Sequence, residues 1–227
     1  MIRILHTADW HLGQTFFGYD RTKEHEAFLD WLLREIRKNE IDALIIAGDV
    51  FDVSNPSAAS QRMYYEFIYR VTAENPGLQI VIVAGNHDSA ARLEAPLPLL
   101  QAMRTEVRGV VRKLNEGEID YDHLAVELKN REGEVEVLCM AVPFLRQGDY
   151  PVVETEGNPY MEGVRELYTQ LLQRLWARRK TNQAILAIGH LQATGSEIAE
   201  KDYSERTVIG GLECVSPVSY THLRAHE

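Results

Sequence analysis

The feature that most constrains the fold of this chain is a set of four short polar motifs, each placed directly after a run of aliphatic residues. The motifs are Asp9-Trp10-His11, Gly48-Asp49, Gly85-Asn86-His87-Asp88 and Gly189-His190. The preceding runs cover residues 2–5, 43–47, 80–84 and 184–188. Short apolar runs separated by helical patterns are typical of buried parallel strands. Ligands bind beyond the carboxyl ends of such strands, so the sequence predicts a polar site assembled from four strand ends.

Helical patterns occupy the segments between these runs. Residues 22–39 and 57–74 each carry an apolar stripe at i, i+3 and i+4 spacing, and residues 161–180 repeat that pattern. The first two predicted helices each connect one apolar run to the next and so complete βαβ units of the expected length. The first three strands are therefore expected to be parallel.

The pattern changes after residue 107. Segments 107–114, 123–128 and 135–142 are short, alternate between apolar and polar residues, and are separated by turn-forming residues. This predicts antiparallel strands of a second sheet packed on the first, with a hairpin turn at residues 131–134.

The chain length of 227 residues and the composition indicate a single domain without a membrane segment. The start of the chain lacks the features of a signal peptide, and no apolar run approaches the roughly 20 residues that span a bilayer. We therefore expect a cytoplasmic protein. The cysteines Cys139 and Cys214 have no CxxC spacing, which predicts reduced thiols. The formal net charge of −10 argues against a broad basic surface for nucleic acid, but cations at a local site would still attract phosphate.

The donor atoms of the motifs suit a centre of two divalent metal ions. Asp9 and His11 lie two residues apart at an extended strand end, so both side chains can reach one ion. Asp49 has two carboxylate oxygens that can bridge two ions, while Asn86 offers an amide oxygen and His190 a ring nitrogen. This mixture of oxygen and nitrogen without sulfur favours Mn²⁺, Fe²⁺ or Zn²⁺. A bound metal lowers the pKa of water from 15.7 to about 7, which eases hydroxide formation by roughly 12 kcal/mol.

The third motif also carries candidates for acid–base chemistry. We expect His87 to donate a hydrogen bond or proton to the leaving oxygen, and Asp88 to orient the ring of His87. The glycines Gly48, Gly85 and Gly189 are expected to let the backbone turn sharply beside the ions.

Five further residues receive weaker interpretations. Asp52 either supports a ligand from outside the centre or caps a turn, and the sequence leaves both roles open. His6, within the first apolar run, is expected in the core. His25 on the first predicted helix and His123 in the antiparallel region are expected at the surface. Trp10 is expected to pack on the side of its strand opposite the ligands.

The order of the four motifs resembles that of the calcineurin-like metallophosphoesterases over about residues 1–213. The stretches ILHTADWHLGQ, AGDVFD and GNHDS are similar to those of bacterial DNA nucleases in that family. The resemblance implies a four-layer αββα sandwich with two mixed sheets flanked by helices. It also implies two Mn²⁺ ions: Asp9 and His11 would hold one, Asn86 and His190 the other, and Asp49 would bridge them while His87 assists catalysis.

The same resemblance implies substrates and partners. Nucleases of this kind cleave DNA ends and hairpins in recombination, replication and repair, act as exonucleases and endonucleases, and work with an SbcC-type ATPase subunit. They are usually homodimers within the larger complex. In some relatives a histidine stands at the position of Asp52, so no catalytic role is transferred to that residue.

One part of the family pattern is missing. The family closes with a Gly-His-x-His motif whose histidines complete the two ion shells, and this sequence contains none. Residues 214–227 form an atypical tail that looks foreign to the predicted domain of residues 1–213. The pair His222 and His226 does not match the motif. We therefore expect the chain as given to bind metal weakly and to have little nuclease activity.

Two alternatives to the nuclease interpretation stay open. The first is a phosphomonoester or small-phosphodiester hydrolase of the same fold. Phosphoprotein phosphatases of the family carry an arginine after the second aspartate and a GNHE motif, whereas Val53 follows Asp52 here and the motif is GNHD. The second alternative is a non-catalytic docking fragment.

Overall fold

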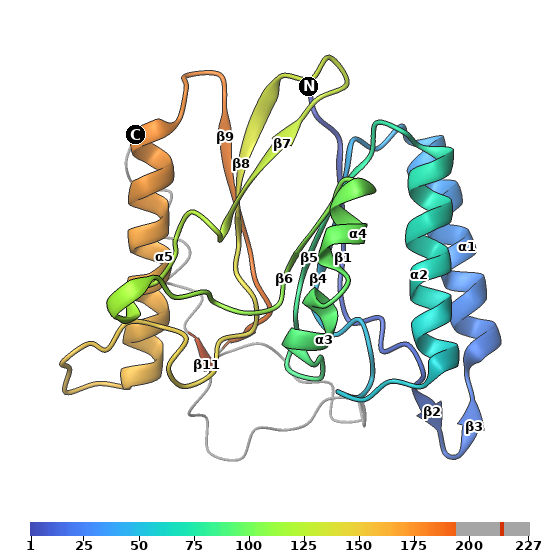
Figure 1. Cartoon of the computed structure of the whole chain (residues 1–227), viewed down its shortest axis with the longest axis horizontal. Helices are drawn as coiled ribbons and strands as arrows, with labels where there is room; N and C mark the ends of the chain where they lie inside the picture. Colours follow the sequence, from blue (N-terminus) through green and yellow to red (C-terminus); the bar gives the residue numbers. More distant parts are fainter. Residues whose placement is uncertain (194–213, 216–227) are drawn as a thin grey trace.

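Two β-sheets lie face to face in the computed structural model, and helices cover the outer face of each (Figure 1). The structure describes residues 1–193 and 214–215. The order of layers is helices, four-stranded sheet, three-stranded sheet and helix. This confirms the predicted four-layer arrangement. Among the described residues, no helix is long and apolar enough to cross a membrane.

The four-stranded sheet follows from the βαβ pattern of the first half of the chain. Its strands run in the order β1-β4-β5-β6, and every pair is parallel. The strands are β1 (Ile4–Thr7), β4 (Ala43–Ala47), β5 (Gln79–Val83) and β6 (Thr105–Arg108). The helices on its outer side are α1 (Thr22–Lys38), α2 (Ala58–Glu74), α3 (Ala90–Glu94) and α4 (Leu97–Ala102).

The three-stranded sheet is mixed. Strand β8 pairs antiparallel with β7 and parallel with β9. Its strands are β7 (Ala125–Lys129), β8 (Val135–Ala141) and β9 (Ala184–Ile188), and helix α5 (Pro159–Arg178) connects the last two. Short elements complete the description: β2 (Thr15–Phe16), β3 (Tyr19–Asp20), a 3₁₀ turn (Asn115–Gly117), β10 (Gln192–Ala193) and β11 (Cys214–Val215).

Helix boundaries coincide with local capping signals in the sequence. The Ser57 side chain accepts a hydrogen bond from the Ser60 N–H at the start of α2. The Asn158 side chain does the same for Tyr160 at the start of α5, where Pro159 occupies the first helical position. Each cap satisfies a backbone donor that the helix itself cannot pair.

Three apolar layers separate the four layers of backbone. Buried residues of α1, α2 and the outer face of the four-stranded sheet form the first, represented by Leu32, Ile68 and Ile82. The second lies between the two sheets. Most of its members are small or β-branched, which suits close packing of two sheets: Ala43, Ile45, Ala47, Val81, Val83, Val126, Val137, Cys139, Ala141 and Ile188, with Leu128 as the exception. The third lies between the mixed sheet and α5.

The structure corrects the prediction for residues 107–114. This segment was expected to be an antiparallel strand of the second sheet, but β6 ends at Arg108 and pairs parallel with β5. The four-stranded sheet is consequently parallel throughout, and only the second sheet is mixed. The connection to β6 consists of the short helices α3 and α4, whose five and six residues are too few to show a helical period.

The surface and core assignments of three histidines were wrong. His6 is exposed rather than in the core. His25 is buried among the side chains under α1, and the His123 side chain is only 8% exposed. Trp10 packs as predicted, with its ring edge-to-face against Phe67. Cys139 is a buried free thiol, as expected.

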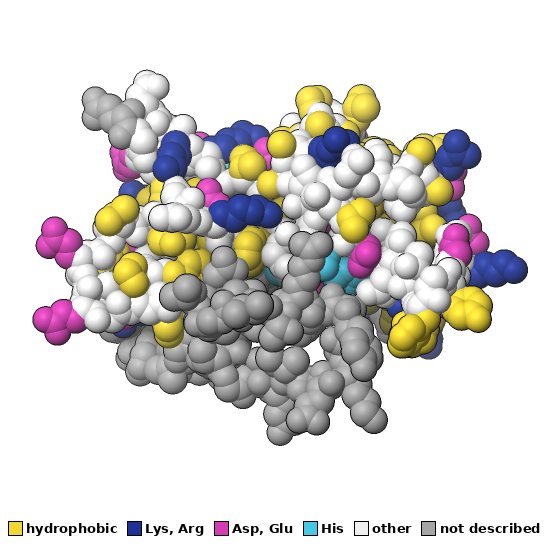
Figure 2. Space-filling model, turned by 90° about the horizontal axis from the view of Figure 1, so that it is seen from below, with side chains coloured by type: hydrophobic (Ala, Val, Ile, Leu, Met, Phe, Trp, Pro, Cys, Tyr) yellow, Lys and Arg dark blue, Asp and Glu magenta, His cyan; other side chains and the backbone are white. Residues whose placement is uncertain are grey.

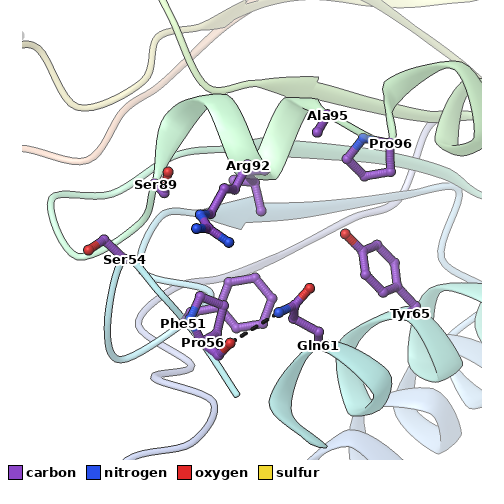
Figure 3. Close-up of a pocket in the computed structure, with 10 residues that line it drawn as sticks. Phe51, Ser54, Pro56, Gln61, Tyr65, Ser89, Arg92, Ala95 and Pro96 are labelled. Carbon is purple, nitrogen blue, oxygen red and sulfur yellow. Dashed lines mark hydrogen bonds between the residues drawn. The ribbon is translucent and has the colours of Figure 1, made fainter. Parts of the chain in front are cut away.

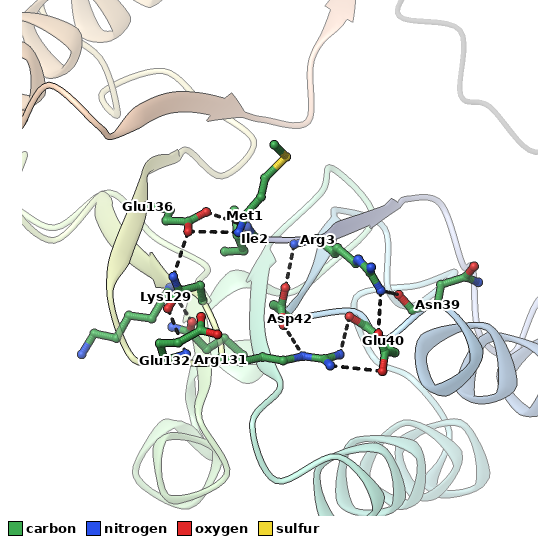
Figure 4. A network of polar contacts seen from close by, with 12 residues as sticks. Met1, Ile2, Arg3, Asn39, Glu40, Asp42, Lys129, Arg131, Glu132 and Glu136 are labelled. Carbon is green, nitrogen blue, oxygen red and sulfur yellow. Dashed lines mark hydrogen bonds and ion pairs between the residues drawn. The ribbon is translucent and has the colours of Figure 1, made fainter.

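A polar network joins the two sheets at the amino ends of β1 and β4 (Figure 4). The buried Asp42 carboxylate accepts hydrogen bonds from the Arg3 N–H at 2.7 Å and from Arg131 Nε at 3.0 Å. Arg131 comes from the β7–β8 hairpin and also pairs with Glu40. The Glu136 carboxylate accepts from the Ile2 N–H. The network therefore holds the second sheet against the start of the chain, at the end remote from the polar motifs.

Candidate metal centre

The donor side chains predicted from the four motifs come together at the carboxyl ends of β1, β4, β5 and β9. Two groups of donor atoms form there, each with its atoms within 4.8 Å of one another: His11, Asp49 and His87, and Asp9, Asp49 and His190. Figure 2 views the molecule from this end, and histidine side chains lie near the middle of the face. Asp49 belongs to both groups, so one carboxylate stands between two sets of donors.

The backbone of the first two motifs forms a small ladder beyond the strands. The Asp9 N–H donates to the Gly48 carbonyl at 3.1 Å, and the His11 N–H donates to the Asp49 carbonyl at 2.9 Å. Asp9, His11 and Asp49 have φ angles of 55°, 45° and 48°. Residues other than glycine rarely adopt this left-handed backbone conformation, which costs about 1–2 kcal/mol per residue. Such strain gathers at functional sites, where the surrounding structure holds it.

Asp49 is the centre of the site. The residue is 3% exposed, and its Oδ1 accepts a hydrogen bond from the His87 N–H at 2.9 Å. Its Oδ2 lies 3.7 Å from His11 Nε2 and 3.5 Å from His190 Nε2. A buried carboxylate with a ring nitrogen on either side of one oxygen is placed to bridge two cations.

The contacts of the His190 ring indicate that the site suits a cation. Its Nδ1 donates to the Ala47 carbonyl oxygen at 2.9 Å, which leaves the lone pair of the neutral ring on Nε2. That nitrogen lies 2.9 Å from Asn86 Oδ1 and 3.5 Å from Asp49 Oδ2. Three electron-pair donors thus converge on one point, and a cation at that point would satisfy all three. The residues present fit a divalent metal ion.

His11 is oriented by Asp52. The His11 Nδ1 lies 3.3 Å from Asp52 Oδ1 and makes no regular hydrogen bond with any described residue. A carboxylate behind one ring nitrogen favours the hydrogen on that nitrogen and leaves Nε2 free as a ligand, a common arrangement at metal sites. Of the two roles left open for Asp52, the structure supports the one that assists a ligand.

Asp52 also holds His87, which the sequence did not indicate. The His87 Nδ1 donates to the Asp52 carbonyl oxygen at 2.7 Å. The rings of His11 and His87 meet edge to face, with centroids 4.9 Å apart. No residue-type signal could have revealed this contact, because a backbone carbonyl carries no sequence information.

The predicted contact between Asp88 and the ring of His87 is wrong. Asp88 points into the protein, where its carboxylate accepts hydrogen bonds from the N–H groups of Val50, Phe51 and Gly85 at 3.2, 3.0 and 2.9 Å. The two residues are neighbours in a tight turn and point to different sides. Burial raises the pKa of Asp88, and the backbone hydrogen bonds from Gly85 and Phe51 oppose this effect. Asp88 therefore ties the Gly48-Asp49 loop to the third motif.

The three predicted glycines are required at the site for different reasons. At Gly189 a Cβ atom would overlap the Tyr168 hydroxyl group. Gly48 has a φ of +92°, and a Cβ atom there would overlap the His190 ring. Gly85 has no such backbone constraint, but its Cβ would overlap the Asp49 carboxylate and backbone nitrogen. The predicted sharp turn thus applies to Gly48, while Gly85 permits close approach of two backbone segments.

Asp9 lies at the solvent-facing side of the centre. Burial raises the pKa of Asp9, the neighbouring His190 lowers it, and the nearby Asp49 raises it again. Two carboxylates that repel each other across a cluster of imidazoles form a site that a divalent cation would stabilise.

Comparison with known proteins agrees with this geometry. The family model for calcineurin-like phosphoesterases matches residues 2–226. The chain belongs to the calcineurin-like phosphoesterase family. The SbcD subunit of nuclease SbcCD from Rhodobacter capsulatus is 38% identical over 232 residues, which cover 99% of this chain and 56% of the relative. The corresponding subunit from Escherichia coli K12 is 32% identical over 219 residues, covering 93% and 51%.

The chain spans about half the length of these curated relatives. Among solved structures, Pseudomonas putida nuclease MPE is 22% identical with a TM-score of 0.33, covering 50% of this chain and 51% of that one. A similarity at that level supports no conclusion about this phosphoesterase. The pair His222 and His226 lies outside the described residues, as does most of the tail from residue 214 onward.

Proposed function

We propose that this phosphoesterase is an SbcD-like DNA nuclease that hydrolyses phosphodiester bonds with two Mn²⁺ ions. The observation that supports this most directly is the position of Asp49, whose carboxylate is shared by two groups of donor atoms. When bound, two such ions activate a water molecule and stabilise the charge on the phosphoryl oxygens. Relatives named as nuclease subunits support DNA as the substrate.

The proposed division of ligands places Asp9 and His11 on one ion and Asn86 and His190 on the other, with Asp49 between them. In the structure Asp9 lies in the group with His190, and His11 in the group with His87. The shared Asp49 supports the two-ion arrangement. The partition of the other donors stays a proposal.

His87 is proposed to act on the leaving group. Its Nδ1 is engaged with the Asp52 carbonyl, so Nε2 is the nitrogen available for the substrate. In hydrolysis a water oxygen attacks phosphorus, the bond from phosphorus to the leaving oxygen breaks, and that oxygen takes up a proton. A hydrogen bond or proton from His87 would stabilise the leaving oxygen at that stage.

The proposal includes partners and cellular context. By analogy with the relatives named as components of SbcCD, we place an SbcC-type ATPase, DNA ends and hairpins, and a second copy of the chain among the partners. The role would lie in recombination, replication and repair in the cytoplasm. Because the net charge is −10, attraction of the DNA backbone would depend on local cations rather than on the whole surface.

The test is cleavage of a hairpin oligonucleotide with and without Mn²⁺. We expect slow cleavage that requires Mn²⁺, because the sequence has no Gly-His-x-His motif, and that is abolished by Asp49→Asn. Asp122→Asn, a change at a carboxylate 80% exposed, is the matched control and should cleave like the unaltered chain. Cleavage of bis(p-nitrophenyl) phosphate but not of DNA would favour a small-phosphodiester hydrolase. Inertness toward both substrates would favour a docking fragment.

A further inference from the structure

A cavity of about 370 Å³ lies beside the metal centre and has no part in the chemistry described above. It opens between the loop after β4, the start of α2, and helix α3 (Figure 3). Its walls include Phe51, Pro56, Gln61, Tyr65, Arg92 and Pro96. The volume lies within the usual range of small-ligand sites.

The cavity shares a wall with the His87 side of the centre. Phe51 lines the cavity with its side chain, while its N–H is held by Asp88. Ser89 follows Asp88 directly and lines the cavity as well. Asp52, the next residue after Phe51, contacts His87. A molecule in the cavity would therefore lie close to His87, the residue proposed above to act on the leaving oxygen.

Arg92 supplies a positive charge to the cavity. The residue is exposed on α3, and its guanidinium group points into the space above Phe51 and Gln61 (Figure 3). It makes no hydrogen bond or ion pair with any other residue in the described ranges 1–193 and 214–215. An unpaired guanidinium presents several N–H donors in a fork that matches phosphate oxygens.

The remaining walls suit a flat heteroaromatic ring. Phe51, Pro56 and Pro96 provide apolar faces, and the Tyr65 ring closes one side (Figure 3). The Gln61 amide nitrogen donates to the Pro56 carbonyl at 3.0 Å, which leaves its amide oxygen as an acceptor. Apolar faces with a few polar groups at the edge recognise nucleobases, whose faces stack and whose edges form hydrogen bonds.

We propose that this cavity binds the nucleoside on the leaving-group side of the scissile phosphate, with Arg92 on a phosphate of the same strand. The inference rests on the proposed nuclease function and adds a substrate subsite to it. It assigns the base to the pocket formed by Phe51, Gln61 and Tyr65. The metal centre would contact only the phosphodiester, so this cavity would let the chain discriminate a nucleotide from other phosphodiesters.

The test compares two probes that differ only by the base, deoxyadenosine 5′-monophosphate and 2-deoxyribose 5-phosphate. Binding is measured by calorimetry on the whole chain in EDTA, so that no metal captures the phosphate. We expect the nucleotide to bind at least tenfold more tightly than the sugar phosphate, and Arg92→Ala to weaken both. Tyr65→Leu should weaken only the nucleotide, by about tenfold.

Arg62→Ala is the matched control. Arg62 lies on the same helix as Gln61 but lines a different groove, between α1 and α2, and its loss should leave both dissociation constants unchanged. Circular dichroism confirms that each variant is folded. Equal affinity for the two probes, failure of the nucleotide to bind, or equal effects of Arg92→Ala and Arg62→Ala would each overturn the proposal.

The two proposals fail separately. The binding constants are measured without metal and do not depend on cleavage. If the chain did not recognise the base, the proposal for the cavity would be rejected, whereas Asp49-dependent cleavage of DNA would still support the nuclease function. If the chain recognised the base but cleaved no DNA, the cavity would be supported as a nucleotide site and the proposed nuclease function would be rejected.

Discussion

At the scale of single residues, the site depends on how buried polar atoms are paired. Residue types at strand ends were enough to predict that Asp9, His11, Asp49, Asn86 and His190 would lie close together. Their role as metal ligands stays a prediction. They were not enough to predict the role of Asp88, because its partners are backbone N–H groups of another loop. His25 and His123 were misplaced for a related reason: their burial follows from tertiary contacts that a helical or alternating pattern does not encode.

Asp88→Ala should destabilise the chain strongly. The change would leave the buried N–H groups of Val50, Phe51 and Gly85 without an acceptor. Each unsatisfied buried donor costs about 1–3 kcal/mol, so a loss of at least about 3 kcal/mol in the free energy of unfolding is expected. Urea denaturation followed by circular dichroism measures it. A loss below about 1 kcal/mol would contradict the anchoring role given to Asp88.

Gly85→Ala should disrupt the metal centre. A Cβ atom at this position overlaps the Asp49 carboxylate, which is buried and has no room to retreat. We expect Mn²⁺ affinity, measured by calorimetry, to fall at least tenfold. Gly77→Ala is the matched control, since a Cβ there meets nothing within 4 Å. Unchanged Mn²⁺ binding in Gly85→Ala would show that Asp49 is not where the ion binds.

At the scale of secondary-structure elements, long periodic segments were predicted well and short ones were not. Helices α1, α2 and α5 and strand β9 lie where the sequence patterns placed them. The segment after residue 107 was assigned to the wrong sheet, because alternation alone does not distinguish a parallel edge strand from an antiparallel one. Helices α3 and α4 determine that assignment, and they are too short to leave a period in the sequence.

The connection from α3 to β6 gives a prediction about pH. Burial alone would raise the pKa of Glu94, but the His123 ring nitrogen 3.8 Å away, hydrogen bonds from the Gly109 and Val110 N–H groups, and Arg112 together outweigh it and hold the pKa at about 2. A carboxylate whose pKa is lowered in the folded state stabilises that state at pH values above its pKa in the unfolded chain, which is 4.5 for Glu94. That stability is lost as pH falls through about 2, and amounts to about 2 kcal/mol in total after a reduction for screening by solvent.

Glu94→Gln should therefore reduce the decrease in unfolding free energy between pH 4.5 and about 2 by about 2 kcal/mol. The measurement is urea denaturation at a series of pH values. Glu154→Gln, at an exposed residue in the loop before α5, should keep the slope of the unaltered chain. If Glu94→Gln also kept that slope, the Glu94 carboxylate would not be the group that couples folding to pH.

At the scale of the whole molecule, two sheets must meet for the fourth motif to reach the other three. His190 follows β9 of the mixed sheet, whereas the other motifs follow strands of the parallel sheet. The sequence predicted a second sheet, but it contained no information on the contacts that align the two. Those contacts are the apolar layer between the sheets and the network around Asp42 at the opposite end (Figure 4).

Asp42→Ala tests that network. The change removes the acceptor of the Arg3 N–H and of Arg131 Nε. Loss of a buried acceptor of this kind is expected to lower the free energy of unfolding by about 2 kcal/mol. Glu40→Ala, at an exposed carboxylate of the same network, should have a much smaller effect in the same urea denaturation. Equal effects of the two changes would show that the buried carboxylate has no special part in joining the sheets.

The central claim is that Asp49 stands between two metal ions, and Mn²⁺ calorimetry on the chain and its Asp49→Asn variant tests it most directly. We predict weak binding of two Mn²⁺ ions per chain, with both lost in Asp49→Asn and neither lost in Asp122→Asn. Weak binding is expected because the sequence has no Gly-His-x-His motif. Binding of a single ion, or retention of both ions after Asp49→Asn, would contradict the two-metal centre.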